Sequence, residues 1–356
     1  MKIVLATGIY PPEIGGPATY VHALAEELSK KNVNVTVITY GVPHQAENWQ
    51  VINISKLLPI LRWISYALAF RTHGKDADAV IAFSSVSAGV PLFLARLKKP
   101  KKILRLGGDF FWERYTDRGG MKSLREWYTS KPRVQWIMQN ILSTFNHIIF
   151  STRFQEEIYE KCYSPLPSHS VIENALPKKT PRLHYKHNPF RLLFMGRFVG
   201  FKNLQVLLES MRMLPNTVLT LVGSGPIEHT LEKMVSRLEI GDRVTFAAPV
   251  HGQAKEFLFE NHDLLIIPSI TEISPNVALE ARAAGLPVLL TKETGLSEGL
   301  IHGMAIRDLS TPEKIYESIK DIQQNYERIA TGSSSPLLQR DWNVVADEWI
   351  RLLSSL

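Results

Sequence analysis

Two carboxylates stand eight positions apart in the segment PSITEISPNVALEARAAGLPVLLT, residues 268–291. Glu272 follows a buried strand predicted from the run HDLLIIPS, and Glu280 lies in a helix predicted from Pro275 to about Ala284. Ligands of parallel sheets bind beyond the carboxyl ends of the strands. Both carboxylates are therefore placed to face one cleft beside a positive helix terminus, which attracts phosphate above all.

Capping residues predict where that helix begins and ends. Ser274 suits the N-cap, Pro275 suits the first helical position, and Gly285 ends the helix. Taken singly, Glu272 and Glu280 are explained equally well as solvated surface residues, because charged side chains are mostly exposed. The pair therefore needs support from elsewhere in the chain.

A basic pair and a glycine pair supply that support. Arg197 and Lys202 lie five positions apart in GRFVGFKN, just after a predicted strand, and a guanidinium with an ammonium suits a diphosphate. Gly15 and Gly16 in EIGGPAT lie between the first strand and the first helix, where bare amides can approach an anion or simply form a tight turn. Neither this loop nor GSGP at 223–226 matches G-x-G-x-x-G, which disfavours dinucleotide-dependent oxidoreduction.

Other carboxylates have less specific surroundings. Asp109 follows a predicted strand in RLGGDFFWERY, and two interpretations stay open: it orients or deprotonates a substrate hydroxyl, or it caps the following turn. Asp76 and Asp78 have the spacing of a metal-binding pair but precede their strand, at the wrong end for a site. Because no His and Cys cluster has ligand spacing either, we expect no metal.

Length and periodicity predict two α/β domains. A chain of 356 residues exceeds what one core usually sustains, and strands alternate with helices in both halves, which implies parallel sheets. We predict two Rossmann-like domains facing across a cleft, the first over residues 1–176 and the second over 188–335. Prolines and basic residues in 174–189 indicate the linker. TGSSSP at 331–336 indicates a break before a final helix, 341–356.

Composition narrows the class of protein. Hydrophobic residues make up 45% and charged residues 21%, as in globular proteins. The start, MKIVLATGIYPP, has no signal-peptide pattern, and the longest apolar run, LLPILRWISYALAF, is too short to span a bilayer. The single cysteine, Cys162, fits a reducing cytoplasm.

Basic residues are in excess, and part of the excess is local. Lys plus Arg exceed Asp plus Glu by 41 − 34 = 7, and RLKKPKK at 96–102 carries five of the basic residues. Such a cluster is a solvated face, or it binds an anionic membrane, a nucleic acid or a phosphate-bearing substrate. No zinc-finger spacing or aromatic RNA-binding signature is present, so we expect no nucleic-acid partner.

Together the motifs GIYPPEIGGPATYVHALAEEL, FMGRFVGFKN, LTLVGSGP, RVTFAAPV and PSITEISPNVALEARAAGLPVLLT resemble glycosyltransferase family 4 over nearly the whole chain. The resemblance implies the GT-B fold, with the final helix, 341–356, crossing back to the first domain. It also implies retaining transfer of a sugar from a nucleotide-diphosphate sugar. Glu280 would bind the donor ribose, Glu272 the donor sugar, and the basic pair the leaving diphosphate. The implied donor-binding residues are Gly15, Gly16, Arg197, Lys202, Glu272, Ile273, Ser274 and Glu280, and the implied catalytic residues are Asp109, Arg197, Lys202 and Glu272.

The resemblance also implies partners and a location. We expect a UDP- or GDP-sugar donor, a glycan or lipid-linked acceptor of cell-envelope polysaccharide or glycoconjugate synthesis, and neither a cofactor nor a required metal. Predicted helices at 57–71 and 121–145 carry Trp, Tyr, Leu and Arg. They could form an acceptor surface near lipid, at the inner face of the membrane, or could serve core packing. A catalytically silent binding module and a nucleotide-sugar epimerase of the same fold are the alternatives, and the intact charged residues favour an active enzyme.

Overall fold

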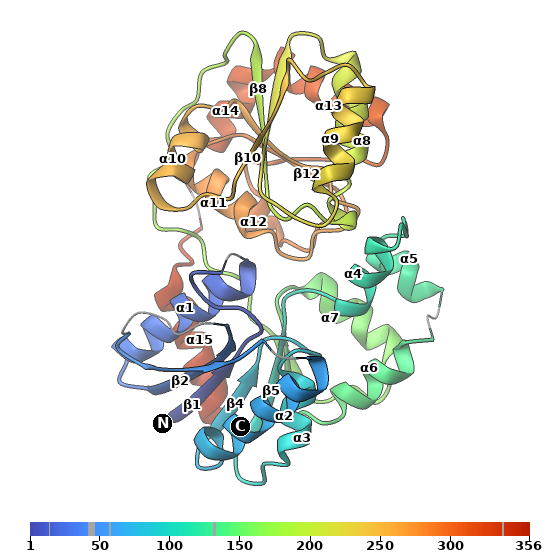
Figure 1. Ribbon diagram of the computed structural model, residues 1–356. Coiled ribbons are helices and arrows are strands. Elements are labelled where there is room, and N and C mark those ends of the chain that lie inside the picture. Colours follow the sequence, from blue (N-terminus) through green and yellow to red (C-terminus); the bar gives the residue numbers. More distant parts are fainter. Residues whose placement is uncertain (14, 42–46, 57, 131–132, 337) are drawn as a thin grey trace. The chain divides into compact units, whose positions relative to one another are not determined.

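The computed structural model describes residues 1–13, 15–41, 47–56, 58–130, 133–336 and 338–356. The chain divides into two compact units (Figure 1). Unit 1 comprises Met1–Phe111, Trp127–Ala175 and Arg340–Leu356, and unit 2 comprises Trp112–Glu126 and Leu176–Gln339. The sequence placed residues 112–126 in the first domain, whereas their contacts group them with unit 2.

Unit 1 is built on a parallel sheet with the order β3-β2-β1-β4-β5-β6-β7. The order reverses between β1 and β4, and right-handed crossovers therefore put later helices on the opposite face from α1. The strands described in this unit are β1 (Lys2–Ala6), β2 (Asn34–Tyr40), β3 (Gln50–Ile54), β4 (Ala79–Ala82), β5 (Lys101–Leu106), β6 (His147–Phe150) and β7 (His169–Val171).

Helices cover both faces of this sheet. The apolar faces of α1 and α15 pack with each other and with strand residues such as Ile3 and Ile81 (Figure 1). α2 packs against α3, and α3 against α6, on the other face. The helices of this unit are α1 (Gly16–Lys30), α2 (Pro59–Ala69), the π-helical turn η1 (Phe70–Gly74), α3 (Gly89–Ala95), α6 (Gln135–Leu142), α7 (Arg153–Cys162) and α15 (Trp342–Ser355). Two further helices include residues of the segment that groups with unit 2: α4 (Phe110–Asp117) and α5 (Leu124–Thr129).

The last helix of the chain, α15, belongs to unit 1. Asp341 caps it, because its Oδ1 accepts a hydrogen bond from the amide of Val344 at 3.1 Å. Trp349 is fully buried, and its Nε1 donates to the hydroxyl of Tyr20 on α1 at 3.0 Å. The chain thus ends in the hydrophobic core of the unit that contains its first residue.

Unit 2 is a second parallel sheet, with the order β10-β9-β8-β11-β12-β13. One apolar core lies under α8, α9 and α13, and another lies under α10, α11 and α12. The strands are β8 (Phe190–Met195), β9 (Thr217–Val222), β10 (Val244–Ala247), β11 (Leu264–Ile267), β12 (Val288–Thr291) and β13 (Ala305–Arg307). The helices are η2 (Gly200–Lys202), α8 (Leu204–Ser210), η3 (Met211–Met213), α9 (Glu228–Arg237), α10 (Gly252–Glu260), α11 (Asn276–Ala284), α12 (Glu298–Ile301), α13 (Pro312–Gln324) and α14 (Tyr326–Ser333).

Two predictions about local structure were wrong. Among its described residues, the stretch 121–145 contains two short helices, α5 and α6, where one long helix was predicted. TGSSSP does not begin with a break, since Thr331 to Ser333 finish α14. The buried guanidinium of Arg282 stabilises the end of this helix, because it donates to the carbonyls of Ser333 and Ser335.

Candidate active site

The loops after two adjacent strands of unit 2 carry most of the predicted donor residues. β8 and β11 lie side by side, and the strand order reverses between them. At such a switch point the loops leave toward opposite faces of the sheet, and ligands bind between them. Arg197 and Lys202 come from the loop after β8, and Glu272 comes from the loop after β11.

Backbone contacts hold these two loops together. Asn203 Nδ2 donates to the carbonyl of Pro268 at 3.2 Å, and the amide of Ile270 donates to the carbonyl of Phe201 at 2.9 Å. Asn203 also has a left-handed backbone, with φ 56°, where η2 turns into α8. The loops therefore form one framework that fixes the positions of their side chains.

The central feature of this framework is an ion pair between Lys202 and Glu272. The Nζ of Lys202 lies 2.5 Å from the Oε1 of Glu272, and their side chains are only 14% and 7% exposed. Ser269 Oγ donates to the same carboxylate oxygen at 2.6 Å. The ammonium also lies 4.8 Å from the centre of the Phe201 ring. Poor solvation strengthens such a pair and makes either partner costly to leave alone.

The backbone of Glu272 is more ordered than the predicted loop. It forms a parallel β-bridge with Thr294: its amide donates to the carbonyl of Glu293 at 2.8 Å, and its carbonyl accepts from the amide of Gly295 at 2.8 Å. The carboxylate is thus oriented by main chain as well as by side chains. Glu272 remains at the edge of the switch point with little freedom to move.

The helix after Glu272 begins one residue later than predicted, and its cap was assigned wrongly. α11 starts at Asn276, and its N-cap is Pro275, whose backbone is extended with ψ 102° and which has no capping side chain. Ser274 is therefore one position too early to reach the free amides of the first turn. Its buried Oγ has no hydrogen-bond partner among the described residues. The predicted end at Gly285 is confirmed, with φ 88°.

Glu280 lies in the second turn of α11 and has a partner that the sequence did not suggest. Its Oε2 accepts a hydrogen bond from the Nζ of Lys255 on α10. Both side chains are partly exposed, so they remain accessible to a ligand. Glu272 and Glu280, the two carboxylates of the motif, thus each hold a different lysine.

Arg197 contacts a segment from much earlier in the chain. Its guanidinium NH2 lies 3.3 Å from Oε2 of Glu113, and the arginine side chain is 58% exposed. The same segment, residues 112–126, reaches both loops: the amide of Gly200 donates to Asp117 at 3.4 Å, and the amide of Leu124 donates to Thr271 Oγ1 at 3.1 Å. A β-carbon on Gly200 would lie 2.4 Å from the carbonyl oxygen of Thr116.

The glycines of GSGP serve close packing. A β-carbon on Gly223 would lie 1.9 Å from the carbonyl oxygen of Gly196, and one on Gly225 would lie 2.3 Å from that of Phe198. The loop after β9 thus presses against the basic loop after β8, where only glycine fits.

The remaining predicted site residues lie in unit 1. Gly15 is the N-cap of α1 and has no side chain to satisfy the first amides, while Gly16 is the first helical residue. The carbonyl of Gly15 accepts from the amide of Thr19 at 3.2 Å. A β-carbon on Gly15 would lie 2.6 Å from Cδ1 of Ile9. The start of α1 therefore offers unsatisfied amides to an anion.

Asp109 lies in a cluster of tyrosines. It is 2% exposed, and its Oδ2 accepts hydrogen bonds from Tyr128 at 2.6 Å and Tyr159 at 2.7 Å. Tyr163 lies 2.9 Å from the Tyr128 hydroxyl. Burial raises the pKa of Tyr128 and Tyr159 well above the usual value, which keeps both phenols neutral as donors. This packing fits a positioned carboxylate, and its contact with a substrate stays a prediction.

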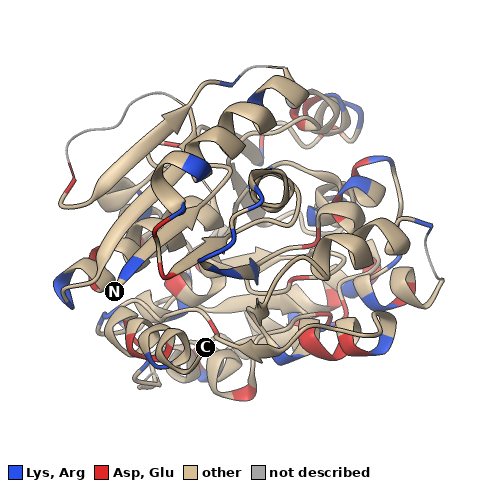
Figure 2. Cartoon of the chain, turned by 90° about the horizontal axis from the view of Figure 1, so that it is seen from below, with Lys and Arg blue, Asp and Glu red and all other residues tan. Residues whose placement is uncertain are grey.

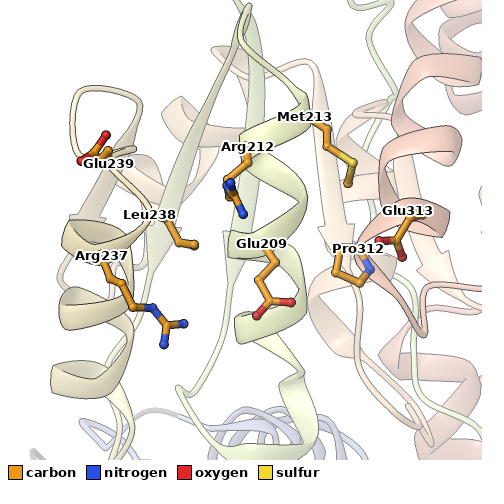
Figure 3. A pocket seen from close by; sticks show the side chains of 8 residues that line it. All are labelled: Glu209, Arg212, Met213, Arg237, Leu238, Glu239, Pro312 and Glu313. Carbon is orange, nitrogen blue, oxygen red and sulfur yellow. The ribbon is translucent and has the colours of Figure 1, made fainter.

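A hollow elsewhere on unit 2 is separate from these loops (Figure 3). It lies where α8 and α9 end and α13 begins, and none of the predicted site residues lines it. Its lining combines carboxylates and guanidinium groups: Glu209, Arg212, Met213, Arg237, Leu238, Glu239, Pro312 and Glu313. With both charge signs exposed, it does not have the character of a diphosphate site.

Two family models match the chain, and together they extend from residue 14 to residue 330. The model described as Glycosyltransferase Family 4 matches residues 14–179, and the model described as Glycosyl transferases group 1 matches residues 177–330. The chain belongs to glycosyltransferase family 4. The predicted resemblance is confirmed, and so is the fold of two Rossmann-like parallel-sheet units.

Relatives support this assignment, and solved structures share the fold. An uncharacterized glycosyltransferase of Methanocaldococcus jannaschii is 26% identical, over 85% of this chain and 83% of its own length. The O-antigen biosynthesis glycosyltransferase WbnH of Escherichia coli is 24% identical, over 88% of each chain. Sucrose-phosphate synthase from Thermosynechococcus elongatus has the same fold, with a TM-score of 0.81, 16% identity, and 99% and 98% coverage. Anabaena HepE in complex with UDP and glucose also has this fold, with a TM-score of 0.75, 16% identity and both chains fully covered.

The structure of this glycosyltransferase adds two residues that the motifs did not single out for the donor site, Lys255 and Glu113. Both are ordinary charged helix residues in the sequence, and only the fold brings them to Glu280 and Arg197. Within the described ranges, no group of three or more His, Cys, Asp or Glu residues is arranged to hold a metal ion. Among the same residues, no helix combines the length and apolar character needed to cross a bilayer.

Proposed function

We propose that this glycosyltransferase is a retaining, metal-independent enzyme that moves a sugar from a UDP- or GDP-sugar to a glycan or lipid-linked acceptor of cell-envelope polysaccharide or glycoconjugate synthesis. The observation that carries the donor part is the ion pair of Lys202 and Glu272 with Arg197 nearby in sequence at the switch point of unit 2. The relative that takes part in O-antigen synthesis supports the acceptor class.

The two cations would act on the leaving group. As the anomeric C–O bond breaks, its electron pair passes to the diphosphate, and the acceptor oxygen forms the new bond on the same face of the sugar. The acceptor proton passes to the departing phosphate oxygen. Lys202 and Arg197 would stabilise the negative charge with the start of α11, and these charges are set in place before reaction. Such groups can replace a metal ion in this task.

The carboxylates would orient the rest of the donor. Glu272 is fixed by its bridge to Thr294, so it can hold sugar hydroxyls in one geometry, together with the amides of Ile273 and Ser274. Glu280 would accept from the ribose hydroxyls, beside Lys255.

Residues of unit 1 complete the proposal. The amides at Gly15 and Gly16 would contact the diphosphate, and Asp109 would orient the acceptor hydroxyl or the side chains around it. For the base, the HepE structure that holds UDP favours a UDP-sugar, and a GDP-sugar is the alternative. The proposed place of action is the cytoplasmic face of a membrane, where lipid-linked acceptors are available.

Thermal denaturation with UDP, GDP, ADP or NAD⁺, each at the same millimolar concentration, tests the donor class. A ligand at 100 times its dissociation constant adds about 2.7 kcal/mol to the free energy of unfolding, a shift of several degrees. A shift with UDP or GDP alone that is lost in Glu280→Ala supports the proposed site. A shift only with NAD⁺, or the same shift in Glu280→Ala, contradicts it.

Product analysis tests the reaction itself. Incubation with the donor that shifts the melting temperature, in the presence of a chelator, should release the nucleoside diphosphate and give a glycoside with the donor's anomeric configuration. Recovery of an isomerised nucleotide sugar would instead indicate the epimerase. Nucleotide binding without any turnover, across soluble and lipid-linked acceptors, would indicate the silent module.

A further inference from the structure

One face of unit 1 exposes an unusual amount of apolar side chain. A helix on the surface of a soluble protein normally carries polar residues on its outer side. The outer side of α2 instead exposes Ile60, 70% accessible, together with Leu61, Ile64 and Leu68, and Leu58 is exposed just before the helix. Its inner side is also apolar, since Tyr66, Ala67 and Ala69 are buried. Apolar patches of this kind mark interaction surfaces.

Neighbouring helices extend the exposed apolar surface. α3 packs against α2 and exposes Phe93 and Leu94, and α6 packs against α3 and exposes Trp136, 74% accessible, and Ile137. Arg71 joins the ends of two of these helices, because its Nε donates to the carbonyl of Ala95 at 3.0 Å. We call the exposed sides of these three helices the α2–α3–α6 face (Figure 1).

The charged residues in the sequence around this face are mostly basic. Residues 48–75, 79–108 and 127–155, which contain the three helices, include no Asp or Glu, and only Asp76 and Asp78 separate the first two stretches. A basic segment, residues 96–102, follows α3 directly, and its Arg96, Lys98, Lys99 and Lys101 are exposed. Lys and Arg positions can be followed in blue in Figure 2.

We propose that the α2–α3–α6 face and the basic segment dock this chain onto an anionic phospholipid bilayer. Apolar residues such as Ile60 would enter the boundary between headgroups and acyl chains, Trp136 would lie at that boundary, and the lysines would pair with lipid phosphates. A second copy of the chain is a poorer occupant, since a two-fold contact would bring the basic segments of both copies toward one surface. The docking is inferred from the exposure and charge of this face alone. The purpose of docking, which is access to a lipid-linked acceptor, rests on the proposed function.

Vesicle flotation with the full chain tests the docking. Wild type should float with vesicles of phosphatidylcholine and phosphatidylglycerol, and bind vesicles of phosphatidylcholine alone at least about tenfold more weakly. The variant Lys98→Gln, Lys99→Gln, Lys101→Gln should lose that preference, and the variant Ile60→Ser, Ile64→Ser should lose binding to both kinds of vesicle. Raising the salt to 0.5 M should weaken wild-type binding, about as much as the lysine changes do.

Matched changes in unit 2 provide the controls. Leu338→Ser and the pair Lys233→Gln, Lys320→Gln alter exposed residues of the same types and should float like wild type. All variants should keep the melting temperature and its shift with nucleotide, which shows that they fold. The docking would be overturned if wild type does not float, or if the variants in the α2–α3–α6 face and the basic segment float like wild type. In either case an unchanged shift of the melting temperature with nucleotide would leave the proposed donor site intact. A dimer in solution that Ile60→Ser, Ile64→Ser breaks, without vesicle binding, would assign the face to a second copy.

Discussion

The predicted site residues of the two units have different electrostatic surroundings. In unit 2, charged site residues form ion pairs: Lys202 with Glu272, Lys255 with Glu280, and Arg197 with Glu113. In unit 1, Asp109 is buried among tyrosines, and the α2–α3–α6 face exposes apolar residues beside the basic segment 96–102. In the proposed function, unit 2 binds a nucleoside diphosphate through charged side chains, which form ion pairs with each other while no ligand is bound. Unit 1 would bind an acceptor or a membrane through its exposed surface, and such binding does not need ion pairs of this kind.

The largest expected effect follows from removing the central cation of unit 2. Lys202→Ala should lower kcat about 10²- to 10³-fold, because the proposed mechanism assigns its charge to the leaving diphosphate, and should change nucleotide binding much less. Steady-state kinetics with the preferred donor, combined with calorimetry of nucleotide binding, separates the two quantities. Lys292→Ala removes an exposed lysine of the same unit that pairs with Asp308, and it should behave like wild type. Unchanged kcat in Lys202→Ala would remove this lysine from the mechanism.

A smaller effect, on nucleotide affinity, is expected from changes in the ion pair of Glu280 and Lys255 in unit 2. Glu280→Ala should weaken nucleotide binding about 10- to 100-fold, since hydrogen bonds to a charged group contribute roughly 1.5–3 kcal/mol. Lys255→Met should weaken it less, because Glu280 stays in place and loses only a partly exposed partner. Calorimetry with the nucleoside diphosphate measures both. Equal losses in the two variants would mean that Lys255 itself contacts the nucleotide.

The dependence of stability on pH should also differ between the units. Burial lowers the pKa of His184 and His262 in unit 2 and of His147 in unit 1. The pKa of His169 in unit 1 is raised: burial acts against this, and the carbonyl of Pro167 and the carboxylate of Glu160 outweigh it.

The sign follows from which state binds more protons. A histidine with a lowered pKa stays neutral in the folded state, so it costs stability as the pH falls below about 6.5. A histidine with a raised pKa contributes stability at low pH and loses it as the pH rises. Unit 2 should therefore lose more stability than unit 1 between about pH 7.5 and 5.5. Hydrogen exchange, corrected for intrinsic rates, compares peptides of β8 and β11 with those of β5 and β6; equal losses would contradict the prediction.

The central strands of both sheets follow from local sequence, and three of the strands at the sheet edges do not. The strands with continuous apolar runs, such as Leu264–Ile267, were predicted because burial on both faces leaves a plain signal. Gln50–Ile54, His169–Val171 and Ala305–Arg307 were not identified as strands, and each lies at the edge of its sheet with only partial burial. Their strand structure depends on a neighbouring strand rather than on their own pattern.

The candidate site divides in the same way. Arg197, Lys202, Glu272 and Glu280 could be found because each follows a strand or lies in a helix within a readable motif. Their partners could not, since Lys255 and Glu113 lie 25 and 84 positions away from the residues they contact. No local pattern encodes such a pairing. For α2 the sequence left two alternatives open, a surface near lipid and core packing, because an apolar helix fits a core as well as a surface.

The smallest expected effect concerns the segment that unit 2 takes from the first half of the chain. Glu113 pairs with Arg197, which the proposed mechanism assigns to the diphosphate, so the carboxylate competes with the ligand for the guanidinium. Glu113→Gln should therefore tighten nucleotide binding by up to about threefold, as expected for an exposed ion pair worth less than 1 kcal/mol. Asp117→Asn changes a carboxylate of the same segment that contacts the amide of Gly200 instead, and it should leave the affinity unchanged. Weaker binding in Glu113→Gln would show that Glu113 positions Arg197 for the ligand, and the segment would then belong to the donor site rather than compete with it.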